Sequence, residues 1–449
     1  MWRAYRRPGT VTAVEKGRGV VDQPGNEPEH QPESPPPAVR AHRLRPMTGR
    51  DPHERHRVAT PLELLFDLTF VIAFGIAASE FSHLLVTGHV GAGLTAFLFG
   101  TFAVCWAWIN FTWFASAYDT DDWIYRLMTM MQMVGVLILA LGLPPFFASI
   151  EHGEHLENTV LAAGYVVMRI ALVGQWLRAA HQDPEHRASC LTYATVVSAV
   201  QVGWIGTIFV HAPVVISLAI WVLLACAEMF GPWLAESRGG TPWHAHHIAE
   251  RYSLLAIIAL GEGVVGTVAS LNAIVSEHGW TTDAILLVIA GTGLTFGMWW
   301  VYFVVPAADL LHARREASFS FGYVHMAVFA AIVATGAGLH TAAYYVEGHS
   351  DLGEMGTVFA VAIPVGVYVA LIYLIYGMLV RSWDVLHFWL LALTAVVLVI
   401  AVLLAWVGVS MAVCLLVVTL APAVTVVGFE VSGHQHAAQA LAKRIADTS

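Results

Sequence analysis

The chain has few charged residues and few cysteines. Asp, Glu, Lys and Arg make up only 12% of its 449 residues, whereas 57% are hydrophobic. This composition excludes a soluble globular protein and indicates a polytopic membrane protein. The four cysteines lie in apolar segments without the short spacing of a metal site or a disulfide framework, so we interpret them as small core residues.

Basic residues are also scarce outside the N-terminal region. Eleven of the twenty-two Lys and Arg residues lie in the first 57 positions, and the formal net charge is -10, so no basic nucleic-acid-binding domain is present. Residues 1–57 are rich in Pro, Arg, Glu and Gly, which predicts a disordered tail without the apolar core of a signal peptide. Met47, close to the first apolar run, is an alternative start to Met1.

Motifs for nucleotide or acyl chemistry are missing as well. The sequence contains neither a Walker A motif nor a GxSxG nucleophile elbow, so nothing in it indicates ATP hydrolysis or serine hydrolysis. We therefore favour a protein that is not an enzyme and expect no cofactor, while a membrane enzyme stays an alternative.

What the chain does have is a series of apolar runs of membrane-spanning length, about 20 residues or more. We predict an all-α fold of twelve spans. They cover residues 62–86, 91–117, 123–149, 158–179, 189–209, 212–236, 247–274, 283–306, 319–345, 355–380, 384–405 and 408–430.

The distribution of Lys and Arg predicts the orientation of these spans. Apart from Arg169, these residues occur in the N-terminal tail, around the connections that follow even-numbered spans, and in the C-terminal tail of residues 433–449. The connections that follow odd-numbered spans contain none. By the positive-inside rule we expect both termini on the cytoplasmic side of the cell (inner) membrane.

Similar patterns recur in the two halves of the chain. Spans one and seven both begin with an acidic residue followed by an aromatic-containing apolar run, and spans two and eight both end rich in Trp. This suggests a six-plus-six parallel repeat of residues 58–238 and 239–432, a pattern in which ligand sites lie between the halves. The alternative is that spanning helices simply resemble one another.

Two acidic residues stand one helical turn apart at the start of the first span. Glu63 has a simple explanation as a cap of the helix start, with Thr60 as N-cap and Pro61 in the first turn. Asp67 lies about 6 Å deeper, where capping cannot explain it. Asp67 either pairs with a buried base or donor, or lines a hydrated path.

Arg169 lies near the centre of the fourth span, too far from either end to reach water. Counting from the cytoplasmic ends places Glu262 near the midplane too, with Glu228 and Asp67 in the inner third. We therefore predict an ion pair between Arg169 and Glu262, which either clamps the halves together or takes part in transport. Glycines at 261, 263 and 266 would allow close helix packing around Glu262.

Two further polar segments could bind a metal. Asp119, Asp121 and Asp122 precede the third span, but they lack the Gly turn and distal Glu of an EF-hand. We prefer the interpretation that Asp121 or Asp122 caps this span and that Arg126 pairs with a neighbour. The HAHH segment at 244–247 is a single histidine cluster, whereas a di-iron membrane enzyme needs several, so we predict no metal site.

Three separated motifs carry a family resemblance. TPLELLFDLTFVIAF, WFASAYDTDDWIYR and HHIAERYSLLAIIALGEGVVG resemble, in this order, the bacterial low-temperature-requirement A family between about Ala59 and Gly336. The resemblance implies a multi-pass membrane protein linked to growth in the cold, without a defined substrate. The motif positions of interest are Glu63, Phe66, Asp67, Asp119, Asp121, Asp122, Arg126, Glu250, Arg251, Gly261 and Glu262.

The family pattern also shows one departure. Its Trp pair is often followed by Tyr-Phe-Asp, whereas here Val304 follows Phe303. Any role of that acid is lost here or shifted to Asp309.

The intramembrane charges and the apparent repeat favour a secondary transporter of a proton, an ion or a small polar solute. Asp67, Glu262, Arg169 and Glu228 are the candidate charge network or transport path. A cation channel is one alternative, and a membrane enzyme or scaffold that adapts lipids or the envelope to cold is the other. The expected partners are the lipid bilayer and a small ion or solute.

Overall fold

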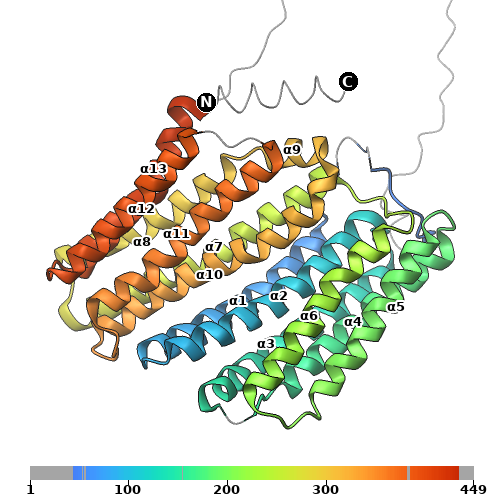
Figure 1. The fold of residues 1–449 in the computed structure, drawn as a ribbon, viewed down its shortest axis with the longest axis horizontal. Helices are drawn as coiled ribbons and strands as arrows, with labels where there is room; N and C mark the ends of the chain where they lie inside the picture. The colour runs from blue at the N-terminus through green and yellow to red at the C-terminus, as the bar shows by residue number, and fades with distance from the viewer. Residues whose placement is uncertain (1–43, 53, 55–56, 154, 382–384, 434–449) are drawn as a thin grey trace, which may run out of the picture. The chain divides into compact units, whose positions relative to one another are not determined.

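The computed structural model describes residues 44–52, 54, 57–153, 155–381 and 385–433. Over these residues the chain is helical, without strands (Figure 1). The α-helices are α1 (Pro61–Val86), α2 (Val90–Tyr118), α3 (Trp123–His152), α4 (Thr159–Gln182), α5 (Arg187–Thr207), α6 (Val214–Glu236), α7 (Ala245–His278), α8 (Thr282–Phe303), α9 (Ala307–Ala313), α10 (Ser318–Val346), α11 (Gly353–Val380), α12 (Val385–Trp406) and α13 (Met411–Gly428). Two short turns, the 3-10 helix η2 (Arg315–Ala317) and the π-helix η3 (Phe429–Gly433), complete the set.

The twelve predicted spans are confirmed, because 12 helical segments among the described residues are long and apolar enough to cross a membrane. The eighth span ends earlier than predicted, since α8 ends at Phe303 and a separate short α9 begins at Ala307. Pro306 between them explains the break, because proline disfavours a helical conformation of the residue before it and lacks an N–H.

The spans expose many large apolar side chains, among them Leu141, Leu223 and Trp389. In a membrane-embedded protein these side chains contact lipid. The lipid bilayer is therefore a partner of this chain.

The start of α1 is determined by local capping. Thr60 accepts a hydrogen bond from the backbone N–H of Glu63, and the Glu63 carboxylate accepts one from the backbone N–H of Thr60. This capping box, with Pro61 in the first turn, satisfies N–H groups that would otherwise lack partners. The predicted capping role of Glu63 is confirmed.

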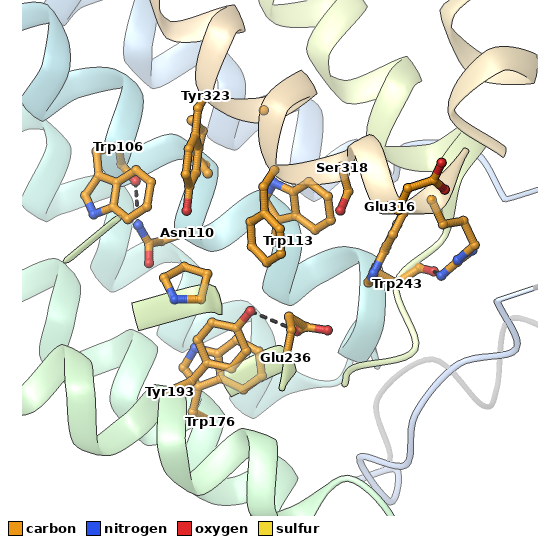
Figure 2. A pocket seen from close by; sticks show the side chains of 15 residues that line it. Trp106, Asn110, Trp113, Trp176, Tyr193, Glu236, Trp243, Glu316, Ser318 and Tyr323 are labelled. Carbon is orange, nitrogen blue, oxygen red and sulfur yellow. Dashed lines mark hydrogen bonds between the residues drawn. The ribbon is translucent and has the colours of Figure 1, made fainter. Parts of the chain in front are cut away.

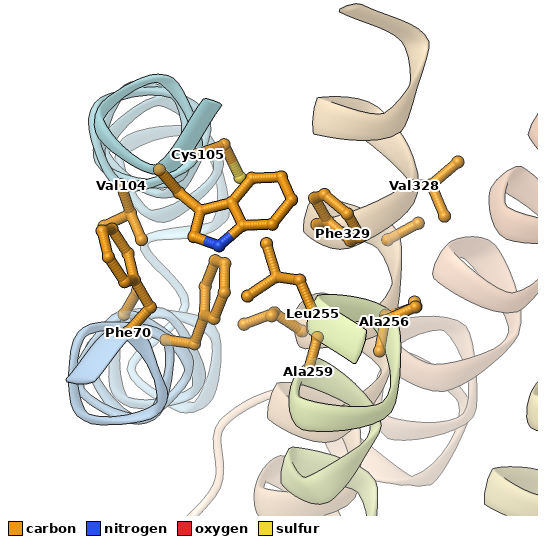
Figure 3. Close-up of a cluster of buried hydrophobic side chains, with 14 of the residues drawn as sticks. Phe70, Val104, Cys105, Leu255, Ala256, Ala259, Val328 and Phe329 are labelled. Atoms are coloured by element: carbon orange, nitrogen blue, oxygen red, sulfur yellow. The ribbon is translucent and has the colours of Figure 1, made fainter. Parts of the chain in front are cut away.

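The two halves of the chain meet where α1 and α2 pack against α7 and α10 (Figure 1). The contact is apolar over much of its length, with Phe70 from α1, Cys105 from α2, Leu255 from α7 and Phe329 from α10 all buried (Figure 3). Between membrane helices such contacts stabilise through close packing rather than through removal of water. Charged groups in this otherwise apolar junction therefore need a specific explanation.

The helices α7 and α10 approach each other especially closely. A Cβ atom on Gly266 would lie 2.7 Å from the carbonyl oxygen of Gly336, and one on Gly336 would lie 2.7 Å from Cβ of Glu262. Small residues at a helix crossing allow this approach. The close packing predicted around Glu262 is confirmed at Gly266, whereas Gly261 faces open space.

Part of the predicted disordered tail is packed onto the helices. Met47 is fully buried, its backbone N–H donates to the side chain of Gln182 at 2.6 Å, and that of Gly49 donates to Asp183 at 3.0 Å. The prediction of disorder up to residue 57 is therefore wrong for residues 44–52, because one apolar anchor and satisfied backbone groups order this short segment. Residues 1–43 and the predicted tail beyond 433 lie outside the described residues.

Several helix neighbours recur in the same order in both halves. The helix α3 packs on α1 and α4, and α10 packs on α7 and α11. The halves differ elsewhere, because α13 packs extensively on α8, whereas α2 and α6 flank a cavity. The duplication itself stays a prediction.

Candidate functional site

Asp67 pairs with an arginine from the other half of the chain. The guanidinium of Arg251 on α7 lies 2.5 Å from Oδ1 of Asp67 through Nη2, and its Nε donates to Oδ2 at 3.2 Å. The indole N–H of Trp108 donates to the same carboxylate at 2.6 Å. All three side chains are buried, so Asp67 has the buried base and donor that were one of its two predicted explanations.

Glu63 joins the same cluster. Its Oε1 lies 2.9 Å from Nη1 of Arg251 and 3.1 Å from Nε2 of His247, both on α7. Arg57 lies 3.8 Å away and bridges to Asp119 at 3.6 Å. We call Glu63, Asp67, Arg251, His247 and Trp108, with their neighbour Arg57, the junction cluster.

The junction cluster is buried, and its ion pairs link α1 to α7. Removing one partner from such a buried ion pair costs about 3–5 kcal/mol, because the other charge is left uncompensated. This arrangement holds the two halves in register. The sequence analysis missed Arg251 as the partner of Asp67 and assigned it to a cytoplasmic connection. The available signal was its position one to two turns inside α7, as deep as Glu63 and Asp67 are in α1.

The predicted ion pair between Arg169 and Glu262 is wrong. Arg169 on α4 pairs instead with Glu228 on α6, with Nη2 lying 3.4 Å from both carboxylate oxygens. Its guanidinium also lies 4.8 Å from the ring centroid of Tyr165, a cation–π contact. The depth count was an insufficient criterion, because α4 packs chiefly on α3 and α5 whereas Glu262 lies on α7.

Glu262 occupies a different environment from the other buried acids. It lies at the middle of the 34-residue α7 and is 5% exposed. Within the described residues it has no ion pair and no hydrogen bond. Its Oε1 lies 3.2 Å from the position of a Cβ atom on Gly75, so a side chain at residue 75 would make a tight contact with the carboxyl group.

The acidic segment before α3 is held by arginines. Asp122 caps α3 by accepting from the backbone N–H of Tyr125 at 3.0 Å, and it also pairs with Arg178 on α4. Arg126 makes two bonds of 2.8 Å to Asp121. The preferred interpretation of this segment, a helix cap with a neighbouring arginine pair, is confirmed.

The pKa values of two carboxyl groups in this segment are shifted in opposite directions. Burial, followed by the nearby charge of Glu63, raises the pKa of Asp119 to about 6. Hydrogen bonds and charge from Arg178 outweigh burial at Asp122 and lower its pKa to about 2. Asp119 is therefore the acid outside the spans whose charge is most costly.

The HAHH segment does not gather its histidines on one centre. His244 is the N-cap of α7 and accepts from the backbone N–H of His247, whose ring contacts Glu63. His246 points elsewhere, 3.4 Å from Asp309. These side chains serve helix capping and the junction cluster.

A cavity of about 280 Å³ lies among α2, α4, α5, α6 and α10, close to η2 (Figure 2). Aromatic side chains form much of its wall. They are Trp106, Trp113, Trp176, Tyr193, Trp243, Phe319 and Tyr323. The sequence analysis missed this aromatic cavity. The Trp-rich end of the second span was a signal, but it was used there only as a repeat marker.

Three charged residues line this cavity, and one of them, Glu316 of η2, pairs with Arg314 at 2.9 Å. Glu236 closes α6 and accepts from the hydroxyl of Tyr193 at 2.9 Å, as the dashed line in Figure 2 shows. Arg315 of η2 stacks on Trp243, with Cζ 3.9 Å from the ring centroid. A narrower void next to it shares Trp106 and Tyr193 and reaches Glu228, so the Arg169–Glu228 pair lies just behind the aromatic wall.

Comparisons with known proteins agree with this architecture. The family model described as bacterial low temperature requirement A protein matches residues 58–422. An uncharacterized protein of Rhizobium meliloti (strain 1021) is 28% identical over 301 residues, which cover 62% of this chain and 67% of that protein. No solved structure matches.

Proposed function

The chain belongs to the bacterial low temperature requirement A family of multi-pass membrane proteins, and on that premise we propose that it is a proton-coupled secondary transporter of a small polar solute. The observation that carries the proposal is Glu262, a carboxyl group at the middle of a membrane-spanning helix that has no polar partner among the residues that the structure describes. An unpaired carboxylate in an apolar interior is costly, so such a group is stable mainly when it binds a proton or a cation.

The surroundings of Glu262 favour a proton. Gly75, Gly266 and Gly336 bring α1, α7 and α10 close together around it, and the room beside its carboxyl group is small. A metal ion would need several oxygen ligands, and the described residues contain no group of three or more side chains suited to hold one. Proton binding changes the charge of the group without any further ligand.

The other members of the predicted charge network then have supporting roles. Asp67 holds α1 to α7 through Arg251, and Arg169 with Glu228 supports the wall of the aromatic cavity. The proton site and the cavity share α10 as a common wall, which is the element through which movement at one would reach the other.

We further propose that the protein resides in the cell membrane with both termini in the cytoplasm. The arginine distribution of the connections supports this orientation. In that orientation the cavity opens near the cytoplasmic end of α6, beside Glu236.

The proton role can be tested without a known solute. Dicyclohexylcarbodiimide reacts with protonated carboxyl groups in apolar surroundings, so we expect the full chain in detergent to be labelled at Glu262 and protected at high pH. Peptide mass spectrometry locates the label. The paired Glu228 serves as the internal control and should stay unlabelled. Labelling of both acids alike, or of neither, would reject the assignment.

Transport is tested by reconstitution. Proteoliposomes with an internal pH dye should show proton movement driven by a potassium diffusion potential when a mixture of small polar solutes is supplied outside, and Glu262→Gln should reduce it to the level of protein-free liposomes. Equal flux in wild type and Glu262→Gln contradicts the proposal. A cation channel would instead give stepwise single-channel currents in planar bilayers, and an enzyme or scaffold would give neither signal.

A further inference from the structure

Three charged side chains line the aromatic cavity, and one of them, Glu316, pairs with Arg314, which is not among the lining residues. Glu236 and Arg315 do not pair with each other. Glu236 is held by neutral donors, namely the hydroxyl of Tyr193 at 2.9 Å and the hydroxyl and N–H of Thr241 at 2.7 and 3.0 Å. These bonds orient the carboxylate but bring no positive charge into contact with it. Its charge stays available to a ligand in the cavity.

Arg315 is the complementary group. Its Nη2 donates to the carbonyl oxygen of Trp243 at 2.7 Å, and its guanidinium stacks on the ring of the same residue. Its Nη1 is buried and has no hydrogen-bond partner within the described residues. A buried donor without a partner is costly, and a carboxylate would satisfy it.

We propose that this cavity binds a small zwitterion, with its ammonium group at Glu236 and its carboxylate at Arg315. The aromatic wall fits the first half of this assignment, because Trp and Tyr faces attract ammonium groups, including alkylated ones. The stacking of Arg315 on Trp243 already shows a cation on one of these faces.

The size of the cavity limits the ligand. Pockets for drug-sized molecules measure about 300–1,000 Å³, and this one, at about 280 Å³, is just below that range. The ligand is therefore of amino-acid or betaine size. The inference rests on the proposed transport function for its physiological meaning, while binding itself can be measured independently.

Binding is tested on the full chain in detergent by isothermal titration calorimetry. The zwitterionic probes are glycine betaine and 4-aminobutyrate, which differ in the spacing of their charges. Choline carries only the positive group and propionate only the negative one. We expect one zwitterion to bind about tenfold or more tightly than choline or propionate, because both charged contacts form only with it.

Substitution of Glu236 and of Arg315 tests the two charged contacts with the ligand separately. We expect Glu236→Gln to weaken the binding of the zwitterion and of choline by about ten- to hundredfold. Arg315→Gln should weaken the binding of the zwitterion and of propionate to a similar extent. The Gln at 236 keeps an oxygen for the hydroxyls of Tyr193 and Thr241 and loses only the bond from the Thr241 N–H, so we expect this variant to retain the local fold. The matched controls Glu277→Gln and Arg187→Gln change exposed residues away from the cavity wall and should bind like wild type.

Three outcomes would overturn this proposal: no binding by either zwitterion, choline binding as tight as theirs, or unchanged affinity in Arg315→Gln. The proposed transport function fails separately. Zwitterion binding together with unchanged proton flux in Glu262→Gln would reject proton coupling and leave the site in place.

Discussion

Asp67 and Glu262 are both buried acids in membrane-spanning helices, yet their surroundings are opposite. Asp67 accepts from Trp108 and pairs with Arg251, whereas Glu262 has glycines beside it and no polar partner within the described part of the chain. A fully paired charge stabilises one arrangement of helices, and an unpaired one leaves its protonation free to change. The comparison separates a structural cluster from a candidate working site.

The largest effect should come from breaking the junction cluster at its centre. Arg251→Leu leaves Glu63 and Asp67 buried without their shared base, so we expect a loss of about 3–5 kcal/mol of stability. The measurement is thermal unfolding of the detergent-solubilised protein. Adding Glu63→Gln and Asp67→Leu removes the stranded charges and should restore most of the loss. If the junction cluster has a role beyond stability, the triple variant should regain its stability without regaining transport.

A smaller loss is expected from removing one charge only. Asp67→Asn keeps an oxygen that accepts from Trp108 but weakens the contact with Arg251, which retains Glu63. We expect about 1.5–3 kcal/mol of destabilisation in the same unfolding measurement, the usual range for a hydrogen bond to a charged group. Glu80→Gln, a half-buried acid on the same helix, is the matched control. Equal destabilisation by Asp67→Asn and Glu80→Gln would contradict a stabilising role for the pairing of Asp67 with Arg251.

The edge of the junction cluster predicts a pH dependence. The pKa of Asp119 is raised to about 6 by burial and by Glu63, so the folded state binds more protons there than the unfolded state. Its contribution to stability is complete below about pH 4 and is lost as the pH rises to about 6, a change of about 1–3 kcal/mol. Asp119→Asn should abolish this decline. The check is the difference in unfolding midpoint between wild type and variant from pH 4 to 7, and a constant difference would refute the assignment.

The smallest stability effect should be at Glu262. Glu262→Gln removes neither an ion pair nor a hydrogen bond among the described residues, so we expect its stability to change by less than about 1 kcal/mol. Proton flux should nevertheless be lost. A destabilisation as large as that of Asp67→Asn would show that Glu262 has a structural partner. Asp67 and Glu262 would then not differ in their pairing.

Much of the fold could be predicted from the sequence because the hydrocarbon core imposes simple rules. A span needs a long apolar run, and Pro61 or Pro306 marks a helix boundary by local chemistry. The cap formed by Thr60 and Glu63 is likewise a contact within one turn. Predictions that depended on neighbours in the chain were reliable for this reason.

The partners of the charges were less predictable. Residue counting places both Arg169 and Glu262 near the midplane of the membrane. The helices that carry them pack on different neighbours, and Arg169 pairs with Glu228 instead. Depth along the membrane normal follows from residue counting, whereas the rotation of a helix about its axis follows from packing. The same reason kept the aromatic cavity out of the sequence analysis, since its wall combines residues from α2 to α10.

The sequence by itself determined that this protein crosses the membrane twelve times, which family it resembles, and which acids are expensive in the spans. Only the tertiary structure decided that Asp67 is neutralised by Arg251, that Glu262 has no polar partner in the described part of the chain, and that Glu236 and Arg315 face one cavity without pairing. The physical reason is that the cost of burying a charge is a property of the residue and the bilayer. Whether that cost is offset depends on groups distant in the chain, which only the packing of helices brings together.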